Sequence, residues 1–461
     1  MNLKDIHSVY FIGIGGIGMS ALARWFNANG YFVAGYDKTV TPLTQKLEAE
    51  GISVHYEDSI ELIPDKVVSD NKTAMIVYTP AVPKEHLEFN FLKDNGFEIL
   101  KRSQVLGELT KNYFTIAVAG THGKTTTSSM IAHILKSSGR NCTAFVGGIM
   151  ANYDSNLIIG NDGVDNVIVV EADEFDRSFL TLHPDIAVIT AVDADHLDIY
   201  GSADSLKDSF KDFIRNIKNN GKLFIEEKSA QKIDVERLNV VNFKTYGLEN
   251  GQINAEKTSV LDGEFKFDFN GSNTKIKELI LPLPGFHNVE NCVAAISVAD
   301  ELNIDAENIR KALSEYKGVK RRFEYIIKTN DLVFIDDYAH HPEEIRALLK
   351  SVRALFPEKK ITVIFQPHLF TRTRDFAQGF SETLSLADEV ILLDIYPARE
   401  LPINGVNSEM LLTAISSGVK GVCTKEALID ELKNKDLEVL ITVGAGDIDA
   451  LVQPIKEALE K

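Results

Sequence analysis

Short apolar runs, each followed by a glycine-rich or polar turn and then by a segment with helical periodicity, recur along this chain. Continuous runs of Val, Ile and Phe are typical of strands buried on both faces of a parallel sheet. The strands predicted in this way are 9–12, 32–36, 73–78, 98–100, 113–119, 167–170, 186–190, 223–226, 332–335, 361–365, 389–393 and 438–443. Predicted helices span 20–29, 125–135 and 289–300, and others begin near Pro342, Thr373, Ser408 and Ile448. The alternation of strand and helix predicts an α/β protein.

One part of the chain departs from this alternation. Residues 238–246 and 264–270 are typical of antiparallel strands, and Asn270-Gly271 supplies a turn. A new strand–turn–helix start at Tyr113 and another near Gly318 mark two domain boundaries. Because the chain has 461 residues and domains average about 150, three domains are expected, at 1–108, 109–318 and 319–461.

Acidic residues outnumber basic ones, since 67 Asp and Glu against 49 Lys and Arg give a formal net charge of −18. A phosphate backbone repels so acidic a chain, which argues against nucleic acid as a partner. The three cysteines are far apart and odd in number, so neither a disulfide framework nor a zinc site is indicated. The apolar segment 9–26 contains several glycines and Arg24, unlike a signal peptide, and no run is long enough to span a membrane. We therefore expect a cytoplasmic protein with no membrane partner, and the sequence does not indicate its oligomeric state.

The most informative segment is AVAGTHGKTTTS, residues 117–128, between a predicted strand and a predicted helix. Gly120 and Gly123 allow a tight turn whose N–H groups converge on an anion at a helix N-terminus. Lys124 adds a full positive charge, and the hydroxyl of Thr125 can bind Mg²⁺. We predict that this loop binds a nucleoside triphosphate.

A second glycine-rich turn follows the first predicted strand. Gly13, Gly15 and Gly18 match the pattern GxGxxG, and Asp37 ends the second predicted strand. The N–H groups of such a turn bind a pyrophosphate, and the acidic residue can bind a ribose. NAD, FAD and the diphosphate of a nucleotide sugar all satisfy this pattern.

Polar side chains also gather where later predicted strands end, which is the edge at which open α/β sheets bind ligands. Glu171 ends one strand and is placed to bind a metal ion, and His196 follows the next strand. Asn291 lies inside a predicted helix, where Asn usually has a partner, and an adenine edge is one option. The later turns with Arg, His and Asp are RRFE at 321–324, DDYAHHP at 336–342 and QPHLFTRTR at 366–374. Arginines in such turns are suited to binding a phosphoryl group while it is transferred, or to binding a carboxylate.

Taken together and in order, these segments resemble the Mur ligase family. The motifs that carry the resemblance are GIGGIGMSALA, GTHGKTTT, EADEFDRSFL, DHLDIYGS, GFHNVEN, RRFE, DDYAHHP and QPHLFTRTR, and they cover the whole chain. The resemblance implies an α/β protein of three domains. The first is a Rossmann-like domain that binds the UDP of the substrate, and the second is a P-loop ATPase-type domain that binds ATP. The third is a C-terminal Rossmann-like domain that binds the amino acid.

The resemblance also implies roles for single residues. The residues expected to bind the UDP substrate are Gly13, Gly15, Gly16, Gly18, Met19, Ser20 and Asp37. Those expected to bind ATP are Gly120, Thr121, His122, Gly123, Lys124, Thr125, Thr126, Asn288 and Asn291. Thr125, Glu171 and His196 are expected to serve Mg²⁺, and Lys124, Arg322, Asp337 and His340 are expected at the reaction centre. His368, Arg372 and Arg374 are the candidates for binding the amino acid.

The activity implied by the resemblance is the ATP-dependent joining of L-alanine to the carboxylate of UDP-N-acetylmuramate, in peptidoglycan precursor synthesis. An acyl phosphate forms first, and the alanine amine then displaces phosphate from it. Closure of the domains would exclude water from that intermediate.

Three departures from related patterns bear on this interpretation. Val118 stands where the general P-loop has a glycine, so this loop is shorter than usual. Ligases that add later residues carry a carbamoylated lysine where this chain has Phe210, so no carbamate can form there. Leu369-Phe370 stands where some relatives have Arg-Tyr, which leaves the later arginines of that turn as the available cations.

Three alternative functions compete with alanine addition. A recycling ligase that attaches an intact peptide to UDP-N-acetylmuramate shares GTHGKTTT and EADE, but GIGGIGMS and RSFL favour alanine addition. An NAD-dependent oxidoreductase would use the first glycine turn and leave the phosphate loop and Glu171 unexplained. A nucleotide switch without catalysis would leave the polar residues at the strand ends unexplained.

Overall fold

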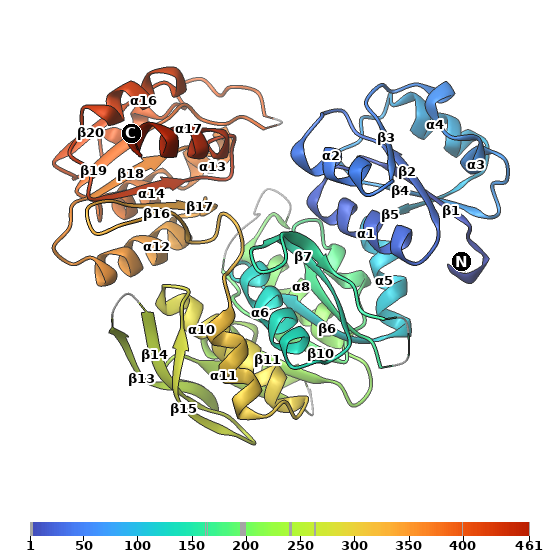
Figure 1. The fold of residues 1–461 in the computed structure, drawn as a ribbon, viewed down its shortest axis with the longest axis horizontal. Helices are drawn as coiled ribbons and strands as arrows, with labels where there is room; N and C mark the ends of the chain where they lie inside the picture. Colours follow the sequence, from blue (N-terminus) through green and yellow to red (C-terminus); the bar gives the residue numbers. More distant parts are fainter. Residues whose placement is uncertain are drawn as a thin grey trace. The chain divides into compact units, whose positions relative to one another are not determined.

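The structure is a computed structural model, and it describes residues 3–161, 163, 165–193, 200–238, 242–261, 264–398 and 400–460. Three β-sheets with accompanying helices follow one another along the chain (Figure 1). This arrangement confirms the predicted α/β class with three domains. Among the described residues, no helix is long and apolar enough to cross a membrane.

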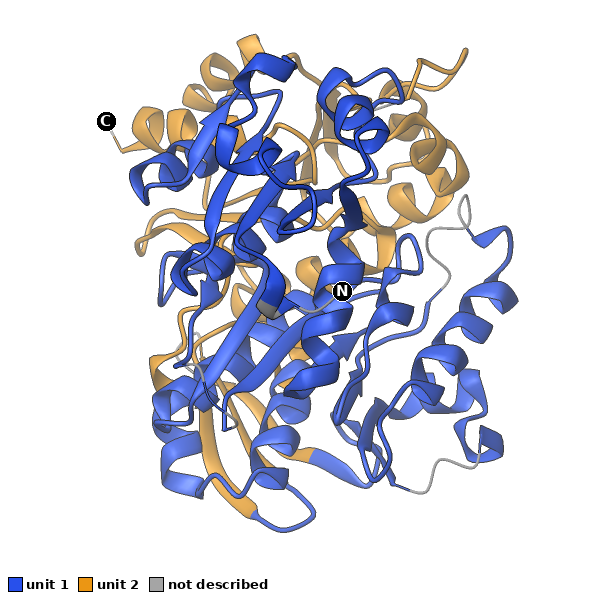
Figure 2. Cartoon of the chain, turned by 90° about the vertical axis from the view of Figure 1, so that its right-hand side faces the viewer, with its two compact units in different colours: residues 1–254, 270–274, 291–312 blue, residues 255–269, 275–290, 313–461 orange. Residues whose placement is uncertain are grey.

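The chain forms two compact units, which Figure 2 colours blue and orange. The first comprises 1–254, 270–274 and 291–312, and the second comprises 255–269, 275–290 and 313–461. The predicted domain limits stay a prediction, and the first of them, between residues 108 and 109, falls within helix α5 (Arg102–Asn112).

The N-terminal sheet is five-stranded and parallel, in the order β3-β2-β1-β4-β5. Alternate residues of β1 enter different cores, because Val9 and Phe11 belong to one buried cluster and Tyr10 and Ile12 to another. The strands are β1 (Ser8–Ile12), β2 (Phe32–Tyr36), β3 (Ser53–His55), β4 (Ala74–Tyr78) and β5 (Glu98–Lys101). Besides α5, the helices that accompany this sheet are α1 (Ile17–Ala28), α2 (Pro42–Ala49), α3 (Asp65–Val68) and α4 (Leu87–Asp94), with 3-10 turns at Leu3–Asp5 and Ile60–Leu62.

Within the first unit, the strands of the central sheet run in the order β12-β11-β10-β6-β9-β7-β8, β12 also pairs with the start of β13, and the phosphate loop follows β6. Its strands are β6 (Phe114–Ala119), β7 (Cys142–Met150), β8 (Ser155–Ile158), β9 (Val167–Ala172), β10 (Ile186–Ile189), β11 (Lys222–Glu226) and β12 (Phe243–Gly247). Its helices are α6 (Lys124–Ser137), α8 (Ala203–Arg215) and α9 (Glu227–Ile233), with 3-10 turns at Ser178–Thr181 and Val235–Leu238. Strands β13 (Ile253–Leu261), β14 (Glu264–Asn270) and β15 (Lys275–Leu281) follow in the chain, before helices α10 (Phe286–Glu301) and α11 (Ala306–Glu315).

The prediction of antiparallel pairing for residues 238–246 is wrong. Strand β12 begins only at Phe243 and pairs in parallel with both β11 and β13. Helix α9 and the 3-10 turn 235–238 stand between β11 and β12 in the chain, and parallel pairing requires a crossover of this length. Sequence alternation alone does not distinguish these two directions.

The C-terminal sheet has the order β16-β17-β21-β18-β19-β20, and β16 is antiparallel to β17 whereas the other pairs are parallel. Its strands are β16 (Glu324–Lys328), β17 (Val333–Asp337), β18 (Ile361–Phe365), β19 (Glu389–Leu392), β20 (Val419–Val422) and β21 (Val439–Val443). Its helices are α12 (Pro342–Leu355), α13 (Phe370–Asp375), α14 (Ala377–Leu384), α15 (Glu409–Leu412), α16 (Lys425–Lys433) and α17 (Asp449–Leu459). Strands β17, β18, β19 and β21 lie within two residues of the strands predicted at 332–335, 361–365, 389–393 and 438–443.

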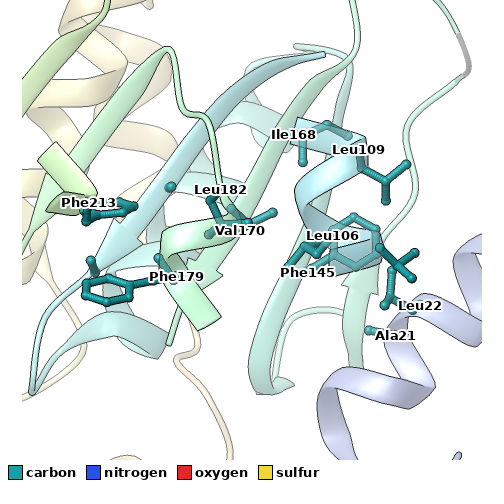
Figure 3. Packing of buried hydrophobic residues seen from close by; sticks show 14 of the residues in the cluster. Ala21, Leu22, Leu106, Leu109, Phe145, Ile168, Val170, Phe179, Leu182 and Phe213 are labelled. Carbon is teal, nitrogen blue, oxygen red and sulfur yellow. The ribbon is translucent and has the colours of Figure 1, made fainter. Parts of the chain in front are cut away.

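One buried cluster runs from helix α1 through α5 into the central sheet. Ala21 and Leu22 of α1 belong to the same apolar core as Leu106 of α5 and Phe145 of β7 (Figure 3). Because apolar burial stabilises by about 25 cal/mol per Å², a continuous core of this kind holds the two sheets of the first unit together.

Candidate active site

The phosphate loop connects β6 to α6, as predicted. Gly120 has φ +139° and Gly123 has φ +79°, which are backbone angles that other residues rarely adopt. A Cβ atom on Gly120 would collide with Oγ1 of Thr190, and a Cβ atom on Gly123 would lie 2.5 Å from Oδ1 of Asn291. The loop therefore requires both glycines. Helix α6 begins immediately afterwards, so its first N–H groups lie at the loop.

Two acceptors hold the ammonium group of Lys124. Its Nζ donates to the carbonyl oxygen of Gly120 at 2.7 Å and lies 2.8 Å from Oε2 of Glu174. Glu174 has no exposed surface, and burial raises the pKa of its carboxyl to about 7 although Lys124 lowers it. Burial also opposes the charge of Lys124, but nearby carboxylates, Glu174 first among them, outweigh that effect and raise the pKa of Lys124. Lys124 is therefore charged at neutral pH.

Thr125 and Glu171 lie together beside the loop. Oγ1 of Thr125 donates to Oε1 of Glu171 at 3.1 Å, and the N–H of Gly147 donates to Oε2 of Glu171 at 2.8 Å. A hydroxyl and a carboxylate oxygen are hard ligands of the kind that Mg²⁺ prefers, so this pair fits that ion. The third predicted ligand, His196, lies outside the described residues. Within the described ranges, no group of three or more His, Cys, Asp or Glu residues is arranged to hold a metal by itself.

The remaining loop residues that the sequence assigns to ATP contact the segment after β10. The N–H of Thr121 donates to Ala191 O at 2.9 Å, and its hydroxyl accepts from the N–H of Asp193 at 3.1 Å. Nε2 of His122 lies 3.7 Å from Oδ2 of Asp193. Thr126 is buried in the first turn of α6. These contacts fix the loop against the end of its neighbouring strand.

The two predicted amides of helix α10 have different partners. Asn291 is buried with its amide beside Gly123, which places it at the phosphate loop. Asn288 is also buried, and its Nδ2 donates to Pro284 O at 2.5 Å. The contact of Asn288 therefore supports the start of α10.

Phe210 occupies an apolar setting. Its side chain has no exposed surface, and its ring centroid lies 5.3 Å from that of Phe179. Phe213, one turn later in α8, stacks on Phe179 at 5.2 Å (Figure 3). Phe210 is thus a core residue of the central domain.

The N-terminal glycine loop closes on the carboxylate at the end of β2. Gly13 has φ +87°, and the N–H of Gly15 donates to Oδ2 of Asp37 at 2.7 Å. Gly16 lies directly before α1, and a Cβ atom on Gly18 would lie 3.0 Å from Nη1 of Arg102. The structure therefore brings Asp37 to the loop, as the sequence indicates. Met19 and Ser20 follow as buried residues of α1.

Asp337 ends strand β17 and is held by backbone groups. Its oxygens accept from the N–H of Phe323 and the N–H of Ala339, each at 2.7 Å. Burial raises the pKa of Asp337 to about 6, although Arg322 lowers it. Nη1 of Arg322 lies 4.0 Å from Oε1 of Glu344. The structure thus brings two of the predicted catalytic residues, Arg322 and Asp337, to one place.

Glu344, at the start of helix α12, accepts hydrogen bonds from the backbone of two histidines. Its Oε2 accepts from the N–H of His340 at 2.9 Å and of His341 at 3.2 Å, and lies 3.5 Å from Nδ1 of His340. Burial lowers the pKa of His340 to about 4, although Glu344 raises it. Burial likewise lowers the pKa of His287 to about 4, again against the effect of Glu344. Both imidazoles are therefore neutral at pH 7.

The three candidates for binding the amino acid separate into two groups. The rings of His340 and His368 have centroids 6.2 Å apart, and the charge of Arg372 acts on His340. Arg374 instead pairs through Nε with Asp375 at 2.7 Å, and half of its side chain is exposed. The structure brings His368 and Arg372 to His340, and it does not do so for Arg374.

Three residues that contact predicted site residues of their own unit have no assigned role in the sequence analysis. Glu174 stands in the acidic run EADE, Gly147 in β7, and Glu344 two residues after the motif DDYAHHP. The acidic run was the available signal for Glu174, and the capping position after Pro342 was the available signal for Glu344. Gly147 has no chemical signature in the sequence.

Comparison with known families matches three successive segments of the chain to models of one family. Residues 8–114 match the model described as "Mur ligase family, catalytic domain", and 118–299 match "Mur ligase middle domain". Residues 321–446 match "Mur ligase, glutamate ligase domain". The chain belongs to the Mur ligase family. The resemblance found in the motifs is thereby confirmed, and with it the assignment as a ligase.

Individual Mur ligases resemble this chain over its full length. A protein of Cytophaga hutchinsonii named UDP-N-acetylmuramate–L-alanine ligase is 50% identical, over 100% of this chain and 98% of the relative. A protein of Christiangramia forsetii with the same name is 48% identical, over 99% of each.

Solved structures extend the comparison. The UDP-N-acetylmuramate–alanine ligase of Thermotoga maritima has a TM-score of 0.81 and 31% identity, with 98% of this chain and 99% of that chain covered. The murein peptide ligase of Psychrobacter arcticus has a TM-score of 0.71 and 23% identity, with 98% of each covered, which shows a shared fold. The recycling ligase is therefore the less favoured alternative. Neither an oxidoreductase nor a nucleotide switch agrees with membership of a ligase family.

Proposed function

We propose that this Mur ligase joins L-alanine to the carboxylate of UDP-N-acetylmuramate, converting ATP to ADP and phosphate. One observation carries the choice of substrates: full-length relatives at 48–50% identity bear the name of that activity. The geometry of the phosphate loop supports the ATP half of the proposal, because a charged lysine, two glycines at positive φ and a helix N-terminus converge there.

The first step is attack of the muramate carboxylate on the γ-phosphorus of ATP, with ADP as the leaving group. Lys124 and the N–H groups of α6 neutralise charge on the phosphates. Thr125 and Glu171 would hold Mg²⁺, which supplies further neutralisation of phosphate charge when it is bound. Asn291, beside Gly123, is the candidate for the adenine.

The second step is attack of the alanine amine on the carbonyl carbon of the acyl phosphate, with phosphate as the leaving group. We assign Arg322 to the phosphoryl oxygens and Asp337 to the same reaction centre. His340 is neutral at pH 7 because burial lowers its pKa, so it places no positive charge beside the amine, and the proton that the amine loses can leave on the phosphate product. His368 and Arg372 are the candidates for holding alanine, and Arg372 is suited to its carboxylate. Because its substrates include ATP, we place the reaction in the cytoplasm.

The test is phosphate release by purified protein with UDP-N-acetylmuramate, ATP and Mg²⁺, with either L-alanine or the tripeptide as the acceptor. Release that depends on L-alanine supports the proposal. Release with the tripeptide alone would assign the recycling activity instead, and a control without the UDP sugar measures background hydrolysis of ATP.

A further inference from the structure

A buried amide ties the β7–β8 hairpin to helix α1. Asn156 of β8 has no exposed surface. Its Nδ2 donates to Ile17 O at 2.5 Å and to Ser20 Oγ at 3.0 Å. Its Oδ1 accepts from Nη1 of Arg24 at 2.7 Å. Positions three or four residues apart share one face of a helix, so this single side chain spans the first two turns of α1.

Charged side chains link helix α2 both to α1 and to the same hairpin. Arg24 is buried, and its Nε donates to Oε2 of Glu50, directly after α2, at 2.6 Å. From α2 itself, Nζ of Lys46 lies 3.0 Å from Oδ2 of Asp154, in the turn before β8. Helices α1 and α2, which both follow the N-terminal glycine loop in sequence, are therefore attached to the hairpin.

The hairpin also holds the candidate metal ligand Glu171. The pairing of β7 with β8 shifts between Phe145 and Met150, so Asn156 lies opposite an irregular stretch that contains Gly147. Such irregularities take backbone N–H groups out of the ladder and give them new partners. The N–H of Gly147 accordingly donates to Glu171 at 2.8 Å. One short stretch of the hairpin thus contacts both the start of α1 and the ATP-site carboxylate.

The start of α1 is also the end of the N-terminal glycine loop. Gly16 directly precedes the helix, and its carbonyl oxygen accepts from the N–H of Ser20 at 2.8 Å. Leu22 and Phe145 belong to the apolar core that the two domains share (Figure 3). Apolar contacts hold the domains together, but they are not directional and do not fix an orientation. Directional hydrogen bonds from Asn156 fix the register of α1 on that core.

We propose that Asn156 is a positioning residue that fixes the loop for the UDP substrate relative to the Thr125–Glu171 pair at the ATP site. The inference rests on the proposed function for the identity of the two ligands. It deepens that function, because a carboxylate carried by one domain must meet a phosphate carried by the other. Misplacing reacting groups by about 1 Å can cost roughly 100-fold in rate.

Three variants test the role of Asn156. Asn156→Ala removes all three contacts, whereas Asn156→Asp keeps the volume and the acceptor for Arg24 and loses the donor to Ile17 and Ser20. Asn166→Ala is the matched control, because Asn166 is also buried and donates to Thr143 of β7 at 3.1 Å. We expect kcat to fall about 10-fold to 100-fold in both Asn156 variants. The dissociation constants of ADP and of UDP-N-acetylmuramate stay within about 2-fold, because each ligand binds its own domain.

Hydrogen exchange supplies a readout that does not depend on turnover. We expect faster exchange in the peptide 13–24 of both Asn156 variants, with the rest of the chain unchanged, and normal exchange there in Asn166→Ala. If Asn156→Ala fails to fold, Asn156→Asp still decides the question. Unchanged exchange and unchanged kcat in Asn156→Asp overturn the inference, and so does an equal loss of kcat in Asn166→Ala. If the wild type does not consume the proposed substrates, the proposed function fails, and the exchange comparison still decides the role of Asn156.

Discussion

Nζ of Lys124 lies 2.8 Å from Oε2 of Glu174, a carboxylate with no exposed surface. An ammonium group has three donors, and here Gly120 O and Glu174 give it two fixed partners. The cation is therefore held in place by the protein before any phosphate arrives. Such pre-organisation is what electrostatic stabilisation of a transferring phosphoryl group requires.

Lys124→Ala is expected to lower kcat roughly 100-fold or more while the protein stays folded. The fold tolerates the change because the buried Glu174, whose pKa is already raised, can take up a proton when its partner is gone. Steady-state phosphate release measures the loss, and circular dichroism checks the fold. Lys136→Ala, at an exposed position near the end of the same helix, is the control. Near-normal turnover in Lys124→Ala would remove Lys124 from the reaction.

Gly147→Ala is expected to raise the Mg²⁺ concentration for half-maximal activity by about 10-fold. An added Cβ would collide with Glu171 and displace the carboxylate from Thr125. A Mg²⁺ titration of initial rates at saturating ATP measures the effect. Gly418→Ala is the control, because nothing lies within 4 Å of a Cβ at that position. The same Mg²⁺ dependence in both variants would show that Glu171 does not serve the metal.

Phe210→Lys is expected to lower stability by about 3 kcal/mol or more and to give no gain in activity with bicarbonate. The lysine would enter an aromatic core against Phe179, where its charge has no hydrated setting. Denaturant unfolding and rates with and without bicarbonate measure the two effects. Phe210→Leu, which keeps the site apolar, serves as the comparison. A bicarbonate-dependent gain in Phe210→Lys would mean that this position can support a carbamate.

His340 is expected to titrate near pH 4 in the folded protein, well below its ordinary pKa of 6.5, because burial disfavours its charged form. The folded protein then binds this proton less readily than the unfolded chain does. The contribution of His340 to the free energy of unfolding therefore falls as the pH drops from about 6.5 toward about 4. A ¹⁵N NMR titration, assigned with His340→Gln, measures the pKa directly. A midpoint at or above 6.5 would contradict the neutral imidazole that is assigned to this position.

The sequence predicts well those parts of the site that are contiguous in the chain. The turn from Gly120 to Thr125 can be predicted because its strand, glycines, lysine and helix stand in one short segment. Glu171 could be placed near it because the carboxyl ends of parallel strands meet at one edge of a sheet, and β6 does pair with β9. Helix α1 nevertheless begins at Ile17 and not at residue 20, since the glycines that flank Ile17 weaken the helical signal.

The contacts that sequence reasoning missed are long-range ones. Glu174 reaches Lys124 across fifty positions, and Asn156 reaches Ile17 across 139 positions. Gly147 contributes a backbone N–H, and its lack of a side chain leaves room for Glu171. Neither property has a sequence signature. Glu344 carries out its role through helix capping, which the sequence analysis did not assign after Pro342.

The most direct test of the central claim uses UDP-N-acetylmuramate labelled with ¹⁸O in its muramoyl carboxylate, together with ATP, Mg²⁺ and L-alanine. Mass spectrometry of the released phosphate and of the UDP product gives the answer. The predicted result is one ¹⁸O atom in each phosphate and a product that has gained one alanine, because the carboxylate oxygen leaves with the acyl phosphate. Phosphate without label, or no alanine in the product, would contradict the account.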